Sequence, residues 1–375
     1  MSVAGLIFSN IHNSSIPELT NVRTMASVPF GCRYRLIDFP LSNMVNSGIT
    51  KIGIITHNNY QSLMDHIGTG KDWDLARRSG GIKILPPFIS ANEGNTKLYT
   101  TRLEALLGVT HFISRCNEDF LVLSDCDGVC NIDLSDVIDY HVSKNADMTI
   151  VTRKIRSDEN LENCGMTSVR SDEDGKVTEV SAYIKNTVND EVSTNIIVVS
   201  RMFLLSALND AKAHGYTHFY HDLVAARLGR ARIFEYHYDK TYIQITSMAS
   251  YFKSSMQLLE CDIRNELLGN NKMPIYTKLR NSAPTIYAEG SSVTNSCIAD
   301  GCVIEGTVEN SIIFRGVKVG KGTVIKNSIL LQDTFTGNNV TLNCVISDKN
   351  SVICDGRILS GYATMPFFIP KGTMV

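Results

Sequence analysis

The sequence has no excess of either charge and no long apolar run. Its 36 basic and 38 acidic residues give a formal net charge of −2 over 375 residues. This balance argues against binding to nucleic acid or to an anionic membrane, since both attract clustered lysine and arginine. No run of about 18 apolar residues is present, and no basic region precedes an apolar stretch with a cleavage site near Met1. We therefore expect a cytoplasmic protein without nucleic-acid or membrane partners.

Metal-site spacing is also missing. None of the 10 cysteines forms a CxxC pair, and the spacings of Cys126 to Cys130 and of Cys297 to Cys302 match no zinc pattern. His218 and His221 would share a helical face, but no third ligand is near them in the sequence, and zinc needs three or four. We expect reduced, structural thiols and no bound metal.

The loop after the first predicted strand lacks glycine and any cation. Val3 to Phe8 is a short apolar run typical of a buried strand, and the following SNIHNSSIPEL contains no Gly, Lys or Arg. A loop that binds nucleotide phosphates needs glycines for close backbone approach and a cation for charge. The absence of both is unfavourable for phosphate binding at this position.

Residues 1–245 alternate apolar strands with helical patterns. Lys51–Thr56 (KIGIIT) and Phe120–Ser124 (FLVLS) are typical of buried strands. Alternation of this kind predicts an α/β domain whose mostly parallel sheet has helices on both faces. Ligands of such sheets bind beyond the carboxyl ends of the strands, where the opening loop would lie.

Three helices are predicted in more detail. One begins after Pro40 and is stopped by Gly48, with Asp38 as its N-terminal cap. A second spans residues 101–113, with three leucines on one face (Leu103, Leu106 and Leu107). The third is a single long amphipathic helix that begins near Ser247 and ends at Gly269.

From residue 284 to 375 the pattern changes to a repeat of six. Apolar residues recur through turns rich in Gly, Asn, Asp and Ser, at Ile298, Ile304, Ile313, Val319, Ile325 and Leu331. A six-residue period predicts a left-handed parallel β-helix, whose faces turn a corner at every hexapeptide. Residues 246–283 would be the linking helix and connector. A prism of this kind often serves for assembly, so we expect an oligomer.

Two long motifs precede the hexapeptides. VPFGCRYRLIDFPLSNMVNSGI (residues 28–49) and DHIGTGKDWDLARRSGGIKILPP (residues 65–87) resemble the ADP-glucose pyrophosphorylase (glucose-1-phosphate adenylyltransferase) family. The resemblance covers nearly the whole chain. It implies a Rossmann-like nucleotidyltransferase domain followed by the β-helix, in a tetramer. It also implies a Mg²⁺-dependent reaction of ATP with glucose 1-phosphate, which releases ADP-glucose and pyrophosphate for glycogen synthesis.

The nucleotide-binding motifs of that family are degenerate here. An active member carries the loop GGxGxRLxPLT and then KPAVPF. By this resemblance, Asn10, Ile11 and Asn13 stand at glycine positions, Ser15 stands at the Arg, and Met25 stands at the Lys. A methionine cannot neutralise a phosphate, and side chains at the glycine positions obstruct close backbone approach.

The metal and sugar motifs are altered as well. The family's GD pair falls on LSDCDGV, where Asp125 or Asp127 could meet a metal, while its second metal Asp falls on Gln244. Tyr183 stands at the Lys that contacts glucose 1-phosphate, and Tyr99–Ala105 (YTTRLEA) has lost the Gly of YRGTADA and moved its Arg. We therefore expect no intact catalytic, substrate or metal site and no cofactor.

An intact framework around lost site residues resembles the D-type, regulatory subunits of this family. That resemblance implies a silent subunit of a heterotetramer, which modulates a catalytic partner. Two alternatives stay open. One is an active adenylyltransferase that recruits charged groups such as Asp125, Asp127, Arg23 and Arg33. The other is a protein that senses phosphorylated sugars through basic residues, the candidates being Arg23, Arg33, Arg35, Lys278 and Arg280. A hexapeptide acyltransferase is set aside, because no histidine follows His237.

Overall fold

The computed structural model describes residues 2–87, 99–155, 165–182 and 191–375. The chain forms two compact units, each assembled from segments that are far apart in the sequence. Unit 1 comprises residues 1–11, 39–60 and 67–242, and unit 2 comprises residues 12–38, 61–66 and 243–375. The linear division into residues 1–245, 246–283 and 284–375 stays a prediction.

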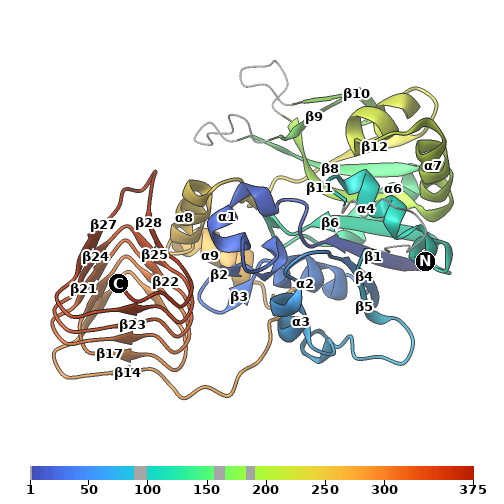
Figure 1. Cartoon of the computed structure of the whole chain (residues 1–375). Coiled ribbons are helices and arrows are strands. Elements are labelled where there is room, and N and C mark those ends of the chain that lie inside the picture. The colour runs from blue at the N-terminus through green and yellow to red at the C-terminus, as the bar shows by residue number, and fades with distance from the viewer. Residues whose placement is uncertain (1, 88–98, 156–164, 183–190) are drawn as a thin grey trace. The chain divides into compact units, whose positions relative to one another are not determined.

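Unit 1 is built on a nine-stranded sheet (Figure 1). Its parallel strands follow the order β6 (Phe120–Asp125), β1 (Val3–Phe8), β4 (Lys51–Ile55) and β5 (Gly81–Leu85). On the other side of β6, β11 (Glu191–Ser200) pairs with it antiparallel. The prediction of a mostly parallel, mixed sheet is therefore confirmed.

The remaining strands of this sheet extend it beyond β11. They are β8 (Met148–Lys154), β9 (Thr167–Ser171), β10 (Val177–Ala182) and β12 (Ile233–His237). β12 runs parallel to β8, whereas β8 and β9 are antiparallel to β11 and β10 is antiparallel to β9. The longer helices packed with this unit include α6 (Leu134–Ser143) and α7 (Arg201–His214).

The helix predicted over residues 101–113 is two helices. α4 (Arg102–Gly108) is separated from α5 (Thr110–Ser114) because Val109 leaves the helical region, at φ −110° and ψ 14°. The leucine face is nevertheless confirmed: Leu103 and Leu106 are fully buried, and Leu107 packs against the same core.

The helix at Pro40 also differs from the prediction. α2 (Asp38–Asn46) begins before the proline, which falls in the first turn, where its missing N–H is not needed by the helix. Asp38 does not cap this helix. Its Oδ2 accepts a hydrogen bond from the backbone N–H of Arg35, which precedes it, and its Oδ1 lies 2.6 Å from His66 Nε2.

Unit 2 contains the β-helix, made of three five-stranded parallel sheets (Figure 1). Its core is a column of apolar side chains that includes Ile304, Ile313, Val319 and Ile325. The sixfold repeat is thus confirmed as a left-handed parallel β-helix. Its strands are β14 (Ile286–Tyr287), β15 (Ser292–Thr294), β16 (Cys297–Ile298), β17 (Val303–Ile304), β18 (Thr307–Glu309), β19 (Ile312–Ile313), β20 (Lys318–Val319), β21 (Val324–Lys326), β22 (Ile329–Leu330), β23 (Phe335–Thr336), β24 (Thr341–Asn343), β25 (Val345–Ser347), β26 (Val352–Ile353), β27 (Ile358–Ser360) and β28 (Phe367–Ile369).

The asparagines at one corner of the β-helix stabilise successive coils. Nδ2 of Asn295 donates to Oδ1 of Asn310 at 2.8 Å, and Asn310 donates to Asn327 in the same way at 2.6 Å. All three have positive φ, a left-handed conformation that asparagine tolerates better than most residues.

Unit 2 also contains segments from other parts of the chain. α1 (Pro17–Thr20) and the antiparallel pair β2 (Pro29–Phe30) and β3 (Tyr34–Arg35) come from its N-terminal segment. The single helix predicted from Ser247 to Gly269 is two, α8 (Met248–Gln257) and α9 (Cys261–Leu268), because Glu260 between them is extended at ψ 128°. In the described part of the chain, no helix combines the length and apolarity that a membrane span requires.

Candidate functional site

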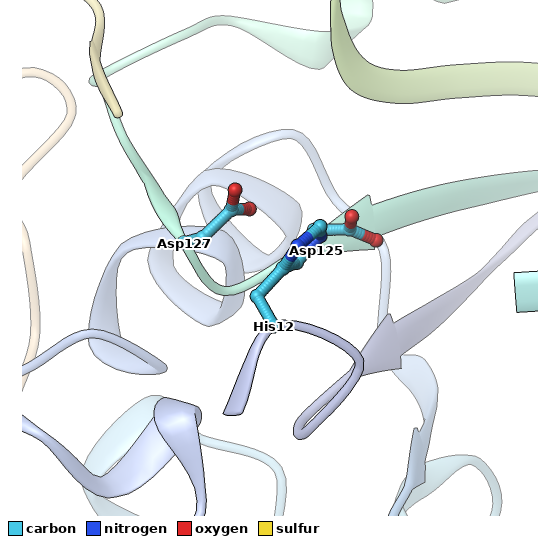
Figure 2. Close-up of side chains that lie close together, drawn as sticks. All are labelled: His12, Asp125 and Asp127. Carbon is cyan, nitrogen blue, oxygen red and sulfur yellow. The ribbon is translucent and has the colours of Figure 1, made fainter. Parts of the chain in front are cut away.

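The carboxyl end of β6 carries two buried carboxylates. Phe8 of β1 lies opposite Asp125 of β6 in the parallel register, so both strands end at the same edge of the sheet. Asp125 is the last residue of β6, and Asp127 follows on the next turn (Figure 2); they are 4% and 1% exposed. The third residue labelled there, His12, belongs to unit 2.

Arg102 neutralises Asp125. Its Nη2 donates to Asp125 Oδ2 at 2.5 Å, and the arginine is only 8% exposed. Arg102 is the first residue of α4, and this helix start is held in place by a capping box between Thr101 and Glu104. Arg102 is the arginine that the altered YTTRLEA motif had moved.

Aromatic rings enclose the Arg102 guanidinium. Its carbon lies 5.6 Å from the ring centre of Phe8, 5.7 Å from that of Phe219 and 5.6 Å from that of Tyr220. Burial alone lowers the pKa of Arg102, but the charge of Asp125 and its hydrogen bond outweigh burial, so the net pKa shift is upward. Arg102 is therefore a permanent cation inside unit 1.

The Arg102 ion pair competes with magnesium for Asp125. Mg²⁺ binds through carboxylates that present their oxygens to the ion in near-octahedral geometry. In unit 1, an internal guanidinium already occupies one face of the Asp125 carboxylate. Arg102 balances the charge of Asp125, one of the two carboxylates, and we derive no metal-dependent step here.

The start of the opening loop packs within unit 1. Asn10 is 3% exposed, and its Oδ1 accepts hydrogen bonds from Tyr99 at 2.9 Å and from Ser9 at 3.3 Å. Ile11 packs against the core of the same unit. Side chains and their hydrogen bonds thus fill positions where a phosphate loop would offer bare backbone.

The rest of the loop is folded within unit 2. Asn13 to Ser15 form a 3₁₀ turn, and Asn13 Oδ1 accepts a 2.8 Å hydrogen bond from the backbone N–H of Met25, whose side chain is buried. Gln244 lies in the short strand β13 (Ile243–Gln244). Tyr183 lies outside the described residues.

A second candidate site is a basic cavity that lies wholly within unit 2. Four of the five basic residues predicted to bind an effector line it: Arg33, Arg35, Lys278 and Arg280. Arg315 and Lys349, which the sequence analysis did not single out, line it as well. A cavity lined by six arginine and lysine side chains suits an anion.

Internal hydrogen bonds fix three of these side chains, those of Arg35, Lys278 and Arg315, whose Nε donates to Asp300 Oδ1 at 2.9 Å. Arg35 Nη1 donates to the backbone oxygen of Ser62 at 2.6 Å and to its hydroxyl at 2.9 Å, and burial lowers the pKa of Arg35 to about 10. Lys278 Nζ donates to the backbone oxygen of Asp65. An anion would therefore meet two arginines and a lysine that are already positioned.

Arg23, the fifth candidate, does not line the cavity. It is 2% exposed and forms a 2.7 Å ion pair with Asp348, which is 1% exposed. Lys349 follows Asp348 directly in the β-helix, and burial, with the charges of Arg35 and Arg23, lowers the pKa of Lys349 to about 6. No local motif marks Lys349, because its role depends on packing against residues distant in the sequence.

The lowered pKa of Lys349 predicts that this side chain takes up a proton when an anion binds in the cavity. Lys349 is mostly neutral at pH 7 to 8, and a bound anion favours its charged form, so affinity should fall as pH rises above about 6. For sulfate, which does not itself titrate here, we expect roughly tenfold weaker binding per pH unit above pH 7. The pKa of His66, which also lines the cavity, is lowered by burial, so it contributes little in this range.

Titration calorimetry of sulfate in buffers with different ionisation enthalpies measures this proton uptake. Lys349→Met should abolish the uptake and the pH dependence, whereas Lys318→Met, at an exposed position of the β-helix, should retain both. Sulfate binding with the same affinity at pH 6 and pH 8 in the unaltered chain would contradict the prediction.

Comparison with known proteins adds to this geometry. Residues 16–181 match the family described as nucleotidyl transferase, and residues 284–361 match the family described as GlmU-like, C-terminal hexapeptide. The first match covers most strands of the sheet in unit 1, and the second covers most of the β-helix.

Named relatives fall into two groups. A glucose-1-phosphate adenylyltransferase of Fervidobacterium nodosum is 31% identical over 95% of this chain and 85% of its own. Proteins named glycogen biosynthesis protein GlgD are 32% identical in Bacillus subtilis, over 98% of this chain and 95% of that one, and 34% identical in Geobacillus stearothermophilus, over 99% and 96%. The chain therefore belongs to the ADP-glucose pyrophosphorylase family, which includes the glucose-1-phosphate adenylyltransferases and the GlgD proteins.

Proposed function

We propose that this protein is a catalytically silent, regulatory subunit of ADP-glucose pyrophosphorylase in glycogen synthesis. The observation that carries the proposal is the buried ion pair between Arg102 and Asp125 at the carboxyl end of β6. Adenylyl transfer needs charge stabilisation that is supplied to the phosphates in the transition state. Here the buried arginine is directed at an internal carboxylate.

The altered opening loop supports the same conclusion. Asn10, Ile11, Asn13, Ser15 and Met25 occupy the positions of the family's glycines and cations, and Asn10 and Asn13 are hydrogen-bonded within the protein. Loss of a single donor or charge at such a site costs on the order of 10²-fold in rate. Several losses together place turnover near the background rate.

The effector role is proposed for the basic cavity of unit 2. Its ligand would be a phosphorylated sugar, whose phosphate the cations around Arg35 and Lys349 would bind. Ligand binding in this cavity would change the activity of a catalytic partner only if the ligand binds the active and inactive states of the assembly with different affinities. Such a coupling free energy is typically about 1–3 kcal/mol.

The partner surface is proposed at the end of the β-helix. Its last coils expose 71–78% of four large apolar side chains, those of Ile358, Tyr362, Met365 and Met374. β26, β27 and β28 are the terminal strands of their sheets. Exposed apolar groups at a sheet end favour docking of another chain, and we propose that this chain is the catalytic subunit.

Turnover of the isolated chain is the first test. With ATP, glucose 1-phosphate and Mg²⁺, we expect a rate at least about 10⁴-fold below that of a catalytic family member, because several charge-stabilising groups are missing. Pyrophosphate release measures it. Asp127→Ala is the matched variant: robust turnover that this change abolishes would overturn the proposal in favour of a rearranged active enzyme.

Mixing with the catalytic subunit of the same organism is the second test. We expect co-elution on size exclusion and a changed KM, kcat or effector response. Ile358→Glu combined with Met365→Glu should prevent co-elution, whereas Met202→Glu, at a 68% exposed position of α7, should not. Separate elution with unchanged kinetics would exclude a regulatory partner role.

A further inference from the structure

Two cysteines of unit 2 meet although they are far apart in the sequence. Cys32 is in the turn between β2 and β3, and Cys297 is the first residue of β16 in the β-helix. Cys32 Sγ lies 3.4 Å from the backbone oxygen of Cys297, and each of the two thiols shifts the pKa of the other. Both residues are partly exposed.

The surroundings make the two sulfurs unequal. Interaction with the Cys32 side chain, assisted by the nearby Arg264 guanidinium of α9, lowers the pKa of Cys297 below its ordinary value. Interaction with the Cys297 side chain, together with burial, raises the pKa of Cys32. These opposite pKa shifts favour Cys297 as the thiolate and Cys32 as the thiol. A thiolate beside a cation is the reactive form of cysteine.

We propose that Cys32 and Cys297 are a redox-responsive pair that a low-molecular-weight disulfide oxidises to an intramolecular disulfide. The Cys297 thiolate attacks one sulfur of the small disulfide, which releases one small thiolate and leaves a mixed disulfide on Cys297. Cys32 then gives up its proton, attacks the Cys297 sulfur and displaces the second small thiolate. The two protein sulfurs lose two electrons, the small disulfide gains them, and the Cys32 proton passes to a released thiolate.

The disulfide would act on the basic cavity. Cys32 lines that cavity next to Arg33 in the sequence, and the cross-link would fix the β2–β3 turn to the first residue of β16. We expect the oxidised chain to bind anions with at least a threefold different affinity. This consequence rests on the anion site proposed above, whereas the disulfide itself does not.

The chain offers a matched control cysteine. Cys344 is partly exposed and has positive φ, as Cys32 does, with values of 52° and 67°. Its thiol lies against the Asn343 side chain, and burial raises its pKa. Cys344 thus resembles Cys32 in exposure and backbone conformation, but its thiol lies against an asparagine side chain and not against a second cysteine.

The test is oxidation of the full-length chain in glutathione buffers of graded ratio, followed by alkylation and non-reducing peptide mass spectrometry. We expect a Cys32–Cys297 peptide to form first, while Cys344 stays alkylatable. Cys32→Gly, which suits the left-handed turn, should abolish the cross-link and leave glutathione on Cys297. Cys344→Asn should retain the cross-link.

Two results would overturn the redox pair: no Cys32–Cys297 peptide in fully oxidised glutathione, or equal modification of Cys32, Cys297 and Cys344. Sulfate calorimetry of the reduced and oxidised chains tests the effect on the cavity separately. Equal affinities, or no sulfate binding in either form, would overturn the coupling to the cavity, and the mass of the cross-linked peptide would still decide the disulfide.

Discussion

Replacing Arg23 with methionine is expected to lower the free energy of unfolding by about 3–5 kcal/mol. The change leaves Asp348, 1% exposed, as a buried carboxylate without the guanidinium that lies 2.7 Å from it. An unpaired buried charge costs far more than the pair itself contributes, since the pair must first repay its own desolvation. Urea denaturation followed by circular dichroism measures the loss.

The double variant Arg23→Met with Asp348→Leu is the control. It removes both charges, so it should recover a large part of the stability lost in the single variant. If Arg23→Met alone unfolds within about 1 kcal/mol of the unaltered chain, the buried pair does not hold unit 2 together as its geometry indicates.

Replacing Arg102 with methionine should destabilise unit 1 by a similar amount, about 3–5 kcal/mol at pH 7. Asp125 would stay buried without its cation, which raises the pKa of its carboxyl. A carboxyl whose folded pKa is raised favours the folded state at low pH, and this advantage is lost as pH rises. The destabilisation should therefore be clearly smaller at pH 5 than at pH 7.

Trp73 makes this test specific to unit 1. It is the one tryptophan of the chain, it is buried, and it lies in unit 1, so its fluorescence during a urea titration follows that unit. Adding Asp125→Asn to the Arg102 variant should remove the pH dependence, because the amide does not ionise. A loss of equal size at both pH values would mean that Arg102 acts by packing against its aromatic rings alone.

The fold was largely predictable from the sequence, because its signals are local. The branched runs of β1, β4 and β6 and the sixfold apolar repeat each indicate an element without reference to distant residues. The errors were also local: one non-helical residue, Val109, and an extended Glu260 each divided a helix whose apolar pattern continues across the break.

The candidate sites were only half predictable. Degenerate motifs predict which groups are missing, since each motif can be compared with the family pattern position by position. The interactions that these positions make instead could not be predicted from such a comparison. Arg102 was recognised as displaced but not as the partner of Asp125, and Lys349 carried no signal, because both roles arise from packing between distant segments.

The ion pair between Arg23 and Asp348 has a consequence for how the protein folds during its synthesis. The two residues are separated by 325 positions, so the N-terminal part of unit 2 leaves the ribosome long before its partner coil exists. At a translation rate of about 5–20 residues per second, Asp348 is synthesised on the order of tens of seconds after Arg23. During that interval a chaperone could hold the nascent segment, and a chain truncated before Asp348 would also lack Lys349 of the basic cavity.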